Sequence, residues 1–496
     1  MRQLLLFSLF NMIVVIMHQT SLLLCAYPAG WSDDILIAQD TLNAVLSSPD
    51  ICVDSHNNVW ITWDDANWWD GDIYYSKRDS LGNCLTPATN VSNNMERSLN
   101  ARIAVDGSGN IQFIWRGDTP QGIGLWHAKY SSNDTVIVPS HMAVSGAGGL
   151  TSSLLPEIAI DKYQNINIAW DEINDGNKMV YTKLDSFGNP IVDKILITPS
   201  GYDAYWVGIG VDSFANSHLA SRMDTSGIPY KLSYSKLDKD GQILISNMVL
   251  TDGLGPAIVC DRHQNIHIVY TNQLGPGNTL EYLKLDQGGN ILIGPDTISP
   301  PEIHSSTYCH AVIDSLQYIH IVWQASQTNW AWLMYAKLDT SGYFIIPPVL
   351  IVGRPYTDGA IEPRIAVDLS NRLHVTWVDR RFTTNVIYYK RGENETGVQD
   401  ELQHKKVSSP TISAHPNPFS YKTTISFGGL DSYKKIILVI YDISGRKIGE
   451  VKKSNLVNYV HWDGCDSRGI RVTPGIYFLV PKNSTKNYAI PVILVD

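Results

Sequence analysis

Apolar and polar positions follow one pattern that returns seven times along the chain. In each copy a short apolar run ends in Asp, a polar turn follows, and an alternating strand ends nine residues after the Asp, in most copies with Trp. The repeat Asp residues are Asp54, Asp106, Asp161, Asp212, Asp261, Asp314 and Asp368. The residues nine positions later are Trp63, Trp115, Trp170, Ser221, Tyr270, Trp323 and Trp377. A period of about 50 residues is typical of a solenoid or a propeller.

Each period contains four strand-like segments. The first is short and rich in small residues, the second alternates, the third carries Tyr-x-Lys, and an Asp-to-Gly turn leads into the fourth. Examples, in that order, are Ile103 to Val105, Ile266 to Tyr270, Tyr234 with Lys236, Asp238 to Gly241, and Ile243 to Ile245. Four antiparallel strands repeated seven times predict an all-β fold, a seven-bladed β-propeller over residues 33–392. The small residues suit a central channel, and the Trp suits packing between blades.

The two ends of this ring are expected to meet. The seventh period has no fourth strand after Tyr389, whereas Ile35 to Ala38 forms an isolated strand ahead of the first period. We expect this N-terminal strand to complete the last blade beside the strand that holds Tyr388, because the pairing removes a free sheet edge.

The segments outside the repeats have different compositions. Residues 1–26 have a positive start and an apolar core, which predicts a signal peptide and export. Leu24 beside Cys25 is large for a lipoprotein signal, so lipidation is the weaker alternative. Residues 393–412 are polar and predict a linker. Residues 413–496 contain alternating strands such as Thr423 to Phe427 and predict a small Ig-like sandwich.

Composition narrows the classes of function. The formal net charge is −10 and no Lys/Arg cluster stands out, which argues against nucleic-acid binding. No Gly-rich phosphate loop, Cys-x-x-Cys or Gly-x-Ser-x-Gly motif is present, so we expect no cofactor. Five cysteines follow the signal at irregular spacing, which does not make a disulfide framework.

The position four residues before the repeat Asp is the best candidate for chemistry, because it varies from blade to blade. Strand order places it at the channel mouth, on the same side as the loops that follow the Trp. Around the ring it holds Asp50, Arg102, Glu157, Gly208, Ala257, His310 and Arg364. Trp68 and Trp69 follow the first repeat Trp. A funnel with carboxylates, Arg and aromatic rings suits a carbohydrate, so Asp50, Arg102, Glu157, His310, Arg364, Trp68 and Trp69 form the predicted ligand site.

Two repeated positions predict structural roles. On the opposite side, each repeat Asp is expected to bind backbone N–H groups of its own turn. Six residues after the Asp stand His218, His267, His320 and His374. Because these four His lie in different blades they cannot share one metal ion, and we expect them to make hydrogen bonds between blades. We expect no metal site.

The C-terminal segment resembles a known family. Pro416-Asn417-Pro418-Phe419, Tyr441 to Arg446, Trp462-Asp463-Gly464 and Pro474 to Phe478 occur in series. They are similar to the C-terminal sorting domain of type IX secretion cargo and to the Ig-like domain of flagellar hook-capping proteins. The resemblance implies recognition by secretion machinery, passage across a bacterial outer membrane, and release or attachment at the cell surface.

The propeller resembles the sialidase-like and BNR-repeat superfamily, which uses Asp and Trp at blade turns. Its turns lack the Ser-x-Asp-x-Gly pattern, and Arg102 and Arg364 stand in Arg-Ile-Ala rather than Arg-Ile-Pro. Three functions stay open. A secreted protein that binds a glycan or protein at the funnel is favoured over a glycosidase using Asp50 and Glu157, and over a non-catalytic adhesion or structural module.

Overall fold

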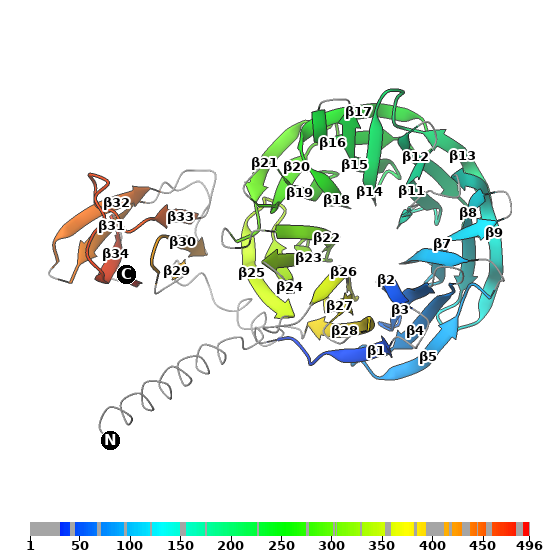
Figure 1. The fold of residues 1–496 in the computed structure, drawn as a ribbon, viewed down its shortest axis with the longest axis horizontal. Helices are drawn as coiled ribbons and strands as arrows, with labels where there is room; N and C mark the ends of the chain where they lie inside the picture. The colour runs from blue at the N-terminus through cyan, green and yellow to red at the C-terminus, as the bar shows by residue number, and fades with distance from the viewer. Residues whose placement is uncertain are drawn as a thin grey trace, which may run out of the picture. The chain divides into compact units, whose positions relative to one another are not determined.

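The computed structural model describes residues 30–39, 45–66, 71–93, 97–119, 122–148, 155–173, 176–225, 228–273, 277–300, 303, 305–327, 330–352, 359–380, 384–392, 411–415, 419–428, 437–443, 445–452, 459–482 and 490–495. The chain divides into two compact units, Met1–Asn394 and Glu395–Asp496. The first unit is a ring of seven four-stranded antiparallel sheets, which confirms the predicted propeller (Figure 1).

The blades follow one another along the chain. Blade 1 contains β2 (Val45–Val53), β3 (Val59–Ala66), β4 (Ile73–Arg78) and β5 (Cys84–Asn90). Blade 2 contains β6 (Ser98–Val105), β7 (Ile111–Thr119), β8 (Gly122–Tyr130) and β9 (Val136–Gly148). Blade 3 contains β10 (Glu157–Ile160), β11 (Ile166–Ile173), β12 (Asn177–Leu184) and β13 (Pro190–Leu196). Blade 4 contains β14 (Asp203–Val211), β15 (Ser217–Thr225), β16 (Ile228–Leu237) and β17 (Ile243–Asp252).

The remaining blades repeat this order and close the ring. Blade 5 contains β18 (Leu254–Cys260), β19 (Ile266–Asn272), β20 (Thr279–Leu285) and β21 (Ile291–Thr297). Blade 6 contains β22 (Ser305–Ile313), β23 (Ile319–Gln327), β24 (Trp330–Leu338) and β25 (Phe344–Val352). Blade 7 contains β26 (Ala360–Val367), β27 (Leu373–Asp379), β28 (Val386–Gly392) and, from the N-terminal side, β1 (Ile35–Gln39).

The last blade confirms the predicted closure. Strand β1 pairs antiparallel with β28, with Ile35 opposite Tyr389 and Leu36 opposite Tyr388 (Figure 1). The Lys390 ammonium, which is buried, makes an ion pair of 2.9 Å with Asp34 just before β1. The N-terminal strand therefore supplies the fourth strand that the seventh repeat lacks.

The aromatic residue nine positions after the repeat Asp packs between blades, as predicted. Trp323 of blade 6 lies in one buried cluster with Val269 and Tyr282 of blade 5. Burying an aromatic side chain contributes about 2–3 kcal/mol, so six such residues tie the ring together. In blade 4 the position is Ser221, whose hydroxyl lies 3.1 Å from that of Ser233.

At one end of every blade the repeat Asp is the centre of a hydrogen-bond network, and we call this the turn end. In blade 5, Asp261 Oδ1 accepts from the backbone N–H groups of His263 at 2.8 Å and Asn265 at 2.9 Å. Its Oδ2 accepts from the Asn265 amide at 2.8 Å and lies 3.2 Å from His267 Nε2. The predicted role of the Asp is confirmed.

The prediction for the four His was wrong. His267 Nδ1 lies 2.8 Å from the hydroxyl of Tyr282, and both partners of this ring belong to its own blade. His218, His320 and His374 also contact the Asp and Tyr of their own blades. The antiparallel register explains this. Tyr282 lies opposite Val269, two residues after His267 and on the same face of the sheet, so its hydroxyl reaches the His267 ring.

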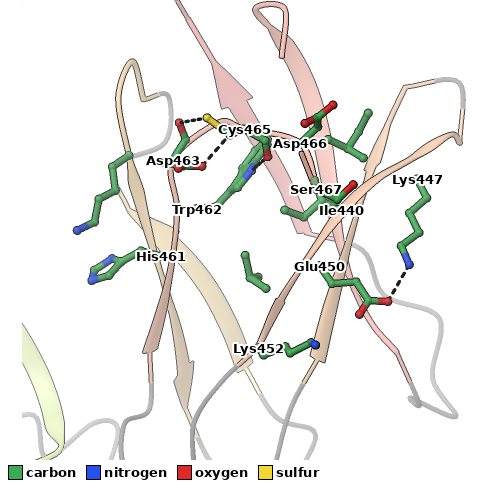
Figure 2. A pocket seen from close by; sticks show the side chains of 14 residues that line it. Ile440, Lys447, Glu450, Lys452, His461, Trp462, Asp463, Cys465, Asp466 and Ser467 are labelled. Carbon is green, nitrogen blue, oxygen red and sulfur yellow. Dashed lines mark hydrogen bonds and ion pairs between the residues drawn. The ribbon is translucent and has the colours of Figure 1, made fainter. Parts of the chain in front are cut away.

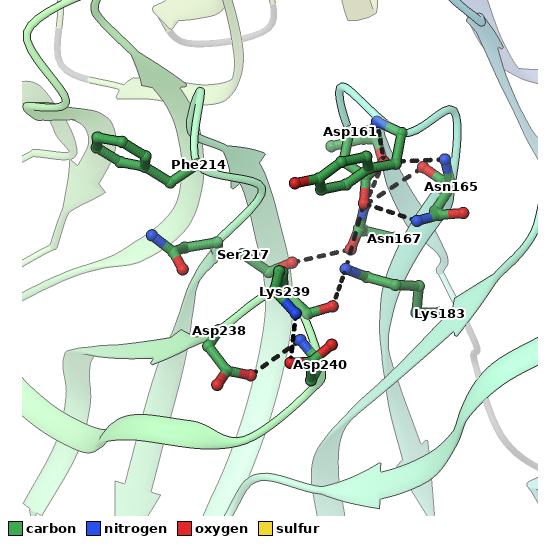
Figure 3. Close-up of polar contacts among 12 residues, drawn as sticks. Asp161, Asn165, Asn167, Lys183, Phe214, Ser217, Asp238, Lys239 and Asp240 are labelled. Atoms are coloured by element: carbon green, nitrogen blue, oxygen red, sulfur yellow. Dashed lines mark hydrogen bonds and ion pairs between the residues drawn. The ribbon is translucent and has the colours of Figure 1, made fainter.

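The third-strand Lys makes the link between blades instead. Lys183 of blade 3 lies 3.2 Å from Asp161 and donates to the carbonyl of Lys239 in blade 4 at 2.7 Å (Figure 3). Lys236 and Lys284 reach the next blade in the same way. Each of these ammonium groups joins one turn to the next around the ring.

A second belt at the turn end uses the residue three positions after the repeat Asp. This residue has a left-handed backbone in every blade. In five blades its side-chain amide oxygen accepts a backbone N–H from the turn of the preceding blade, through Asn57, Gln164, Gln264, Gln317 and Asn371. The Asn57 contact with Leu369 N, at 3.0 Å, closes this belt between blades 7 and 1.

The second unit contains two sheets. One has the order β29 (Thr411–His415), β30 (Thr423–Gly428), β33 (Tyr459–Trp462), and the other β32 (Lys447–Lys452), β31 (Ile437–Asp442), β34 (Gly475–Pro481), β35 (Ile490–Leu494). They share a buried core that includes Phe419, Trp462 and Tyr477. A turn begins at Asp442, where Gly445 N donates to the Asp442 carbonyl at 2.9 Å.

Candidate functional site

The end of the blades opposite the turns, which we call the mouth end, is where the first strands begin. Here the structure brings together residues from blades far apart in the chain. Arg102 Nε donates to Glu157 Oε1 at 3.0 Å, and Arg364 donates to Glu157 Oε2 at 3.0 Å. Arg364 belongs to blade 7 and Glu157 to blade 3, so this contact bridges the ring. We call Asp50, Arg102, Glu157, His310 and Arg364 the cross-channel cluster.

Two members of the cross-channel cluster are anchored to the neighbouring blade. Asp50 Oδ2 accepts from Ile103 N at 2.9 Å, and Ile365 N donates to His310 Nδ1 at 3.3 Å. Gly208 holds the same position in blade 4. A side chain there would meet the Pro256 carbonyl of blade 5 at 2.3 Å, so only glycine fits between these two first strands.

The charges of the cross-channel cluster largely neutralise one another. Burial disfavours the Glu157 carboxylate, but Arg102 and Arg364 outweigh it and lower the pKa of Glu157 to about 2. Burial, more than the opposing pull of Arg364, raises the pKa of Asp50. Burial and then the Arg364 charge lower the pKa of His310 to about 3, so this imidazole is neutral near pH 7. Glu157 therefore cannot donate a proton at neutral pH.

A backbone bulge precedes the cross-channel position in six blades. The pairing register shifts there, and the residue six positions before the repeat Asp is left-handed. These residues, with φ between 48° and 59°, are Ser48, Asn100, Trp206, Gly255, Tyr308 and Glu362. Left-handed backbone is unusual for bulky residues and recurs at ligand sites. The side chains at these six positions all differ.

Three bulge residues form a polar arc across blades 7, 1 and 2. Ser48 N donates to a Glu362 oxygen at 3.1 Å, and the Ser48 hydroxyl donates to the Asn100 side chain at 3.0 Å. Asn100 N in turn donates to Asp64 Oδ2 at 2.8 Å, and the Ser47 hydroxyl donates to Asp64 Oδ1. Burial raises the pKa of Asp64 to about 7 against these hydrogen bonds. The arc thus contains a buried carboxyl group that titrates near neutral pH.

An aromatic cradle lies at the mouth end of blade 4. The Arg222 guanidinium carbon lies 4.9, 5.5 and 4.2 Å from the ring centres of Tyr205, Trp206 and Tyr230. Asp224 pairs with Arg222 and accepts Tyr230 N at 2.8 Å. Trp206 and Tyr230 both have left-handed backbones, at φ 51° and 64°. Trp206 remains 39% exposed, so the cradle presents an indole to solvent, whereas the Arg222 side chain is only 18% exposed.

The predicted site residues have different outcomes. Asp50, Arg102, Glu157, His310 and Arg364 do come together at the channel, where Glu157 pairs with both Arg and where Asp50 and His310 accept backbone N–H groups. Trp68 and Trp69 lie outside the described residues. Sequence reasoning missed the bulge residues, above all Tyr308, which is 56% exposed. Asn and Gly adopt left-handed backbone more readily than other residues. Asn100 and Gly255 at this repeat position could therefore have indicated the bulge.

A groove of about 830 Å³ lies in the second unit, between the sheet-edge strands β32 and β33. Its walls include Lys447, Glu450, His461 and Asp463 (Figure 2). Glu450 accepts from Lys447 and from Lys482, each at 2.8 Å. These opposite charges are exposed and pair with one another.

No known protein-family profile matches the sequence, and no curated protein matches it. Comparison with solved structures finds β-propellers. An ulvan lyase of polysaccharide lyase family PL25, bound to -[GlcA(1-4)Rha3S]-, superposes with a TM-score of 0.53 and 11% identity, covering 73% of this chain and 96% of that one. A Streptococcus pneumoniae NanB sialidase variant gives a TM-score of 0.44, 11% identity, and coverage of 72% and 70%.

A Dyadobacter fermentans protein of unknown function gives a TM-score of 0.47 and 10% identity, covering 73% of this chain and 99% of that one. At 11% identity and a TM-score of 0.53, the ulvan lyase comparison establishes a shared propeller fold and nothing about function. Within the described residues, no helix is long and apolar enough to cross a membrane. In the same part of the chain, no group of three or more His, Cys, Asp or Glu side chains is placed to hold a metal.

Proposed function

We propose that this protein binds an extracellular glycan at the mouth end of its propeller. The observation that carries the proposal is the aromatic cradle, in which exposed Trp206 lies over Arg222 on a strained backbone. Sugars stack their C–H faces on aromatic rings and form hydrogen bonds at their edges, and the cradle offers both kinds of contact.

The rest of the mouth end supports an oligosaccharide more than a single sugar. Exposed Tyr308 in blade 6 and the polar arc through Glu362, Ser48 and Asn100 add further contacts around the rim. The cross-channel cluster joins blades 2, 3 and 7 through the pairing of Arg102, Glu157 and Arg364. Because Arg102 and Arg364 are held by Glu157, we expect exposed rim residues rather than these two Arg to make the first contact with the ligand.

A glycan array with the purified chain tests this proposal. Binding should fall at least tenfold in Trp206→Ala, with a smaller loss in Tyr308→Ala. Phe214→Ala is the matched control, because Phe214 is 56% exposed but lies in the turn after Asp212 at the other end of blade 4. Absence of any glycan bound, or binding equally weakened by Phe214→Ala, would overturn the proposal.

Glycoside hydrolysis is the second candidate, since the pKa values of Asp50 and Glu157 move in opposite directions. A retaining glycosidase uses a carboxyl group with a raised pKa as the acid and an ionised carboxylate as the nucleophile. Asp50→Asn should then abolish turnover of chromogenic glycosides while the propeller stays folded. Glu157→Gln is a poorer test, because it leaves two buried guanidinium groups without their anion.

We also propose that residues 413–496 direct export across an outer membrane. The support is the ordered series of motifs from Pro416 to Phe478 and the apolar N-terminal segment. A reporter fused to residues 413–496 should reach the medium or cell surface of a bacterium with a type IX system. Retention of that reporter in the periplasm would contradict the assignment.

A further inference from the structure

Blade 2 departs from the repeat at the outer part of its boundary with blade 3. In the other blades the third strand carries a buried Tyr, and in blades 4, 5 and 7 its ring packs against the turn of the next blade. Gly289, for example, packs against Tyr234 and Met248, and Gly342 against Tyr282 and Ile293. In blade 2 the Tyr is replaced by His127, and the fourth-strand residue beside it is His141. The turn that packs on this pair contains Gly188.

The two imidazoles face the same point. His127 and His141 are directly opposite each other in the β8–β9 register, with ring centres 5.2 Å apart and ring planes at 89°. A Cβ at Gly188 would lie 2.3 Å from His127 Nδ1 and 2.8 Å from His141 Nε2. The two nitrogens are therefore no further apart than the sum of these two distances.

The hydrogen bonds on the far side of each ring fix which nitrogen carries the proton. Gln112 Nε2 donates to Asp106 Oδ2 at 3.0 Å, which turns Gln112 Oε1 toward His127 Nε2 at 2.8 Å. His127 Nε2 is thus the protonated nitrogen. His141 Nδ1 lies 3.1 Å from the Pro139 carbonyl, which can only accept, so His141 Nδ1 is protonated as well.

Two unprotonated nitrogens consequently lie against the same residue, Gly188. His127 is fully buried, and its Nδ1 has no hydrogen-bond partner among the described residues. A buried acceptor without a donor is costly, and two facing lone pairs repel each other. An imidazole whose other N–H is held by an amide or carbonyl oxygen is the usual arrangement of a metal ligand.

We propose that His127 Nδ1 and His141 Nε2 form a binding site for a divalent transition-metal ion such as Zn²⁺. Two imidazole nitrogens sharing Zn²⁺ at about 2.0–2.1 Å each lie at most about 4.2 Å apart, a separation compatible with the geometry at Gly188. Water would complete the coordination. Such an ion would tie the outermost strand of blade 2, β9, to β8.

The surroundings keep the ligands available. Lys129 is occupied by its 3.0 Å ion pair with Asp106. The Asp185 carboxylate of the blade 3 turn adds a nearby negative charge. This site is separate from the cross-channel cluster and does not depend on the glycan proposal.

Calorimetric titration of the purified chain with ZnCl₂ tests the site. The expected result is one saturable Zn²⁺ per chain, with a rise in melting temperature on binding. His141→Val should lower the Zn²⁺ affinity at least tenfold. His127→Tyr, which restores the residue of the other blades, should have the same effect with the fold retained. His263→Ala is the control, since His263 is exposed in the blade 5 turn.

Two results would overturn the inference. One is the absence of saturable Zn²⁺ binding to the unaltered chain. The other is binding that survives in both His141→Val and His127→Tyr, or that disappears in His263→Ala, since the ion would then be held elsewhere. The melting temperature without metal, measured for each variant, separates loss of the site from loss of the fold.

Discussion

The two ends of each blade use the same strands in opposite ways. At the turn end, an Asp, a left-handed turn residue and a set of hydrogen bonds recur around the ring, and Lys and amide side chains link neighbouring blades. At the mouth end, the backbone bulge recurs but its side chain changes from Ser48 to Trp206 to Glu362. At the turn end every blade has the same structural role, so the residue type recurs. The proposed binding surface at the mouth end carries a different side chain in each of these blades.

Deleting residues 33–40 should be the most damaging change to the shared scaffold. Without β1, strand β28 becomes a free edge in blade 7, and Lys390 loses its Asp34 partner in a buried position. We expect the melting temperature to fall by about 10 °C or more. Calorimetry of the shortened chain measures this, and an unchanged transition would disprove the role of β1 in closure.

Substitutions at the two ends should differ in their effect on stability. Asp261→Ala removes the partner of His267 and of the turn N–H groups in a buried network, which should cost about 3–5 kcal/mol. Tyr308→Ala at the mouth end removes an exposed side chain and should change stability by about 0.5 kcal/mol or less. Urea unfolding of both variants gives the comparison. Equal losses would remove the distinction between the two ends.

The pH dependence of stability should reveal the mouth end between about pH 4 and pH 7. Burial raises the pKa of Asp64 to about 7, so the folded chain binds a proton that the unfolded chain releases near pH 4. Stability should therefore fall as pH rises from about 4 to 7, by up to about 4 kcal/mol.

Asp64→Asn provides the matched variant for this pH effect. Its amide can donate to Ser47, and its oxygen can still accept from Asn100 N. Thermal unfolding from pH 4 to pH 8 should show a weaker decline than in the unaltered chain. Parallel curves for the two proteins would show that Asp64 is not the titrating group.

The turn end should respond in the opposite direction, under acid. Burial raises the pKa of Asp212, but the hydrogen bonds from His218 and Asn216 outweigh it and lower the value to about 2. The stabilisation is present above about pH 4 and is lost as pH falls toward 2. Asp212→Asn should flatten this acid loss in denaturation followed by circular dichroism. An unchanged acid transition would argue against the repeat Asp as its source.

The sequence predicts the scaffold well because the scaffold is periodic. The Asp spacing, the Trp and the isolated strand at Ile35 each predict a feature that the structure confirms. The belt of turn amides is also visible as Asn or Gln three residues after five of the repeat Asp residues. The pattern alone does not tell which blade such an amide contacts.

The mouth end is harder to predict because its contacts follow no period. The pairing of Glu157 with Arg364 depends on a contact across the ring, and spacing along the chain carries no sign of it. The left-handed conformations of Trp206, Tyr308 and Glu362 are set by the bulge, since these residue types do not favour that backbone. The prediction for the four His failed for a different reason. Their repeated position suggested hydrogen bonds between blades, whereas the strand register gives each His its partners within its own blade.

Hydrogen–deuterium exchange with and without a bound glycan tests the central claim most directly. If the mouth end is the binding surface, protection should appear at the starts of the first strands, around Ser48, Trp206 and Tyr308, while the turns that hold Asp212 and Asp261 exchange unchanged. Protection confined to those turns, with the mouth end unaffected, would contradict the account.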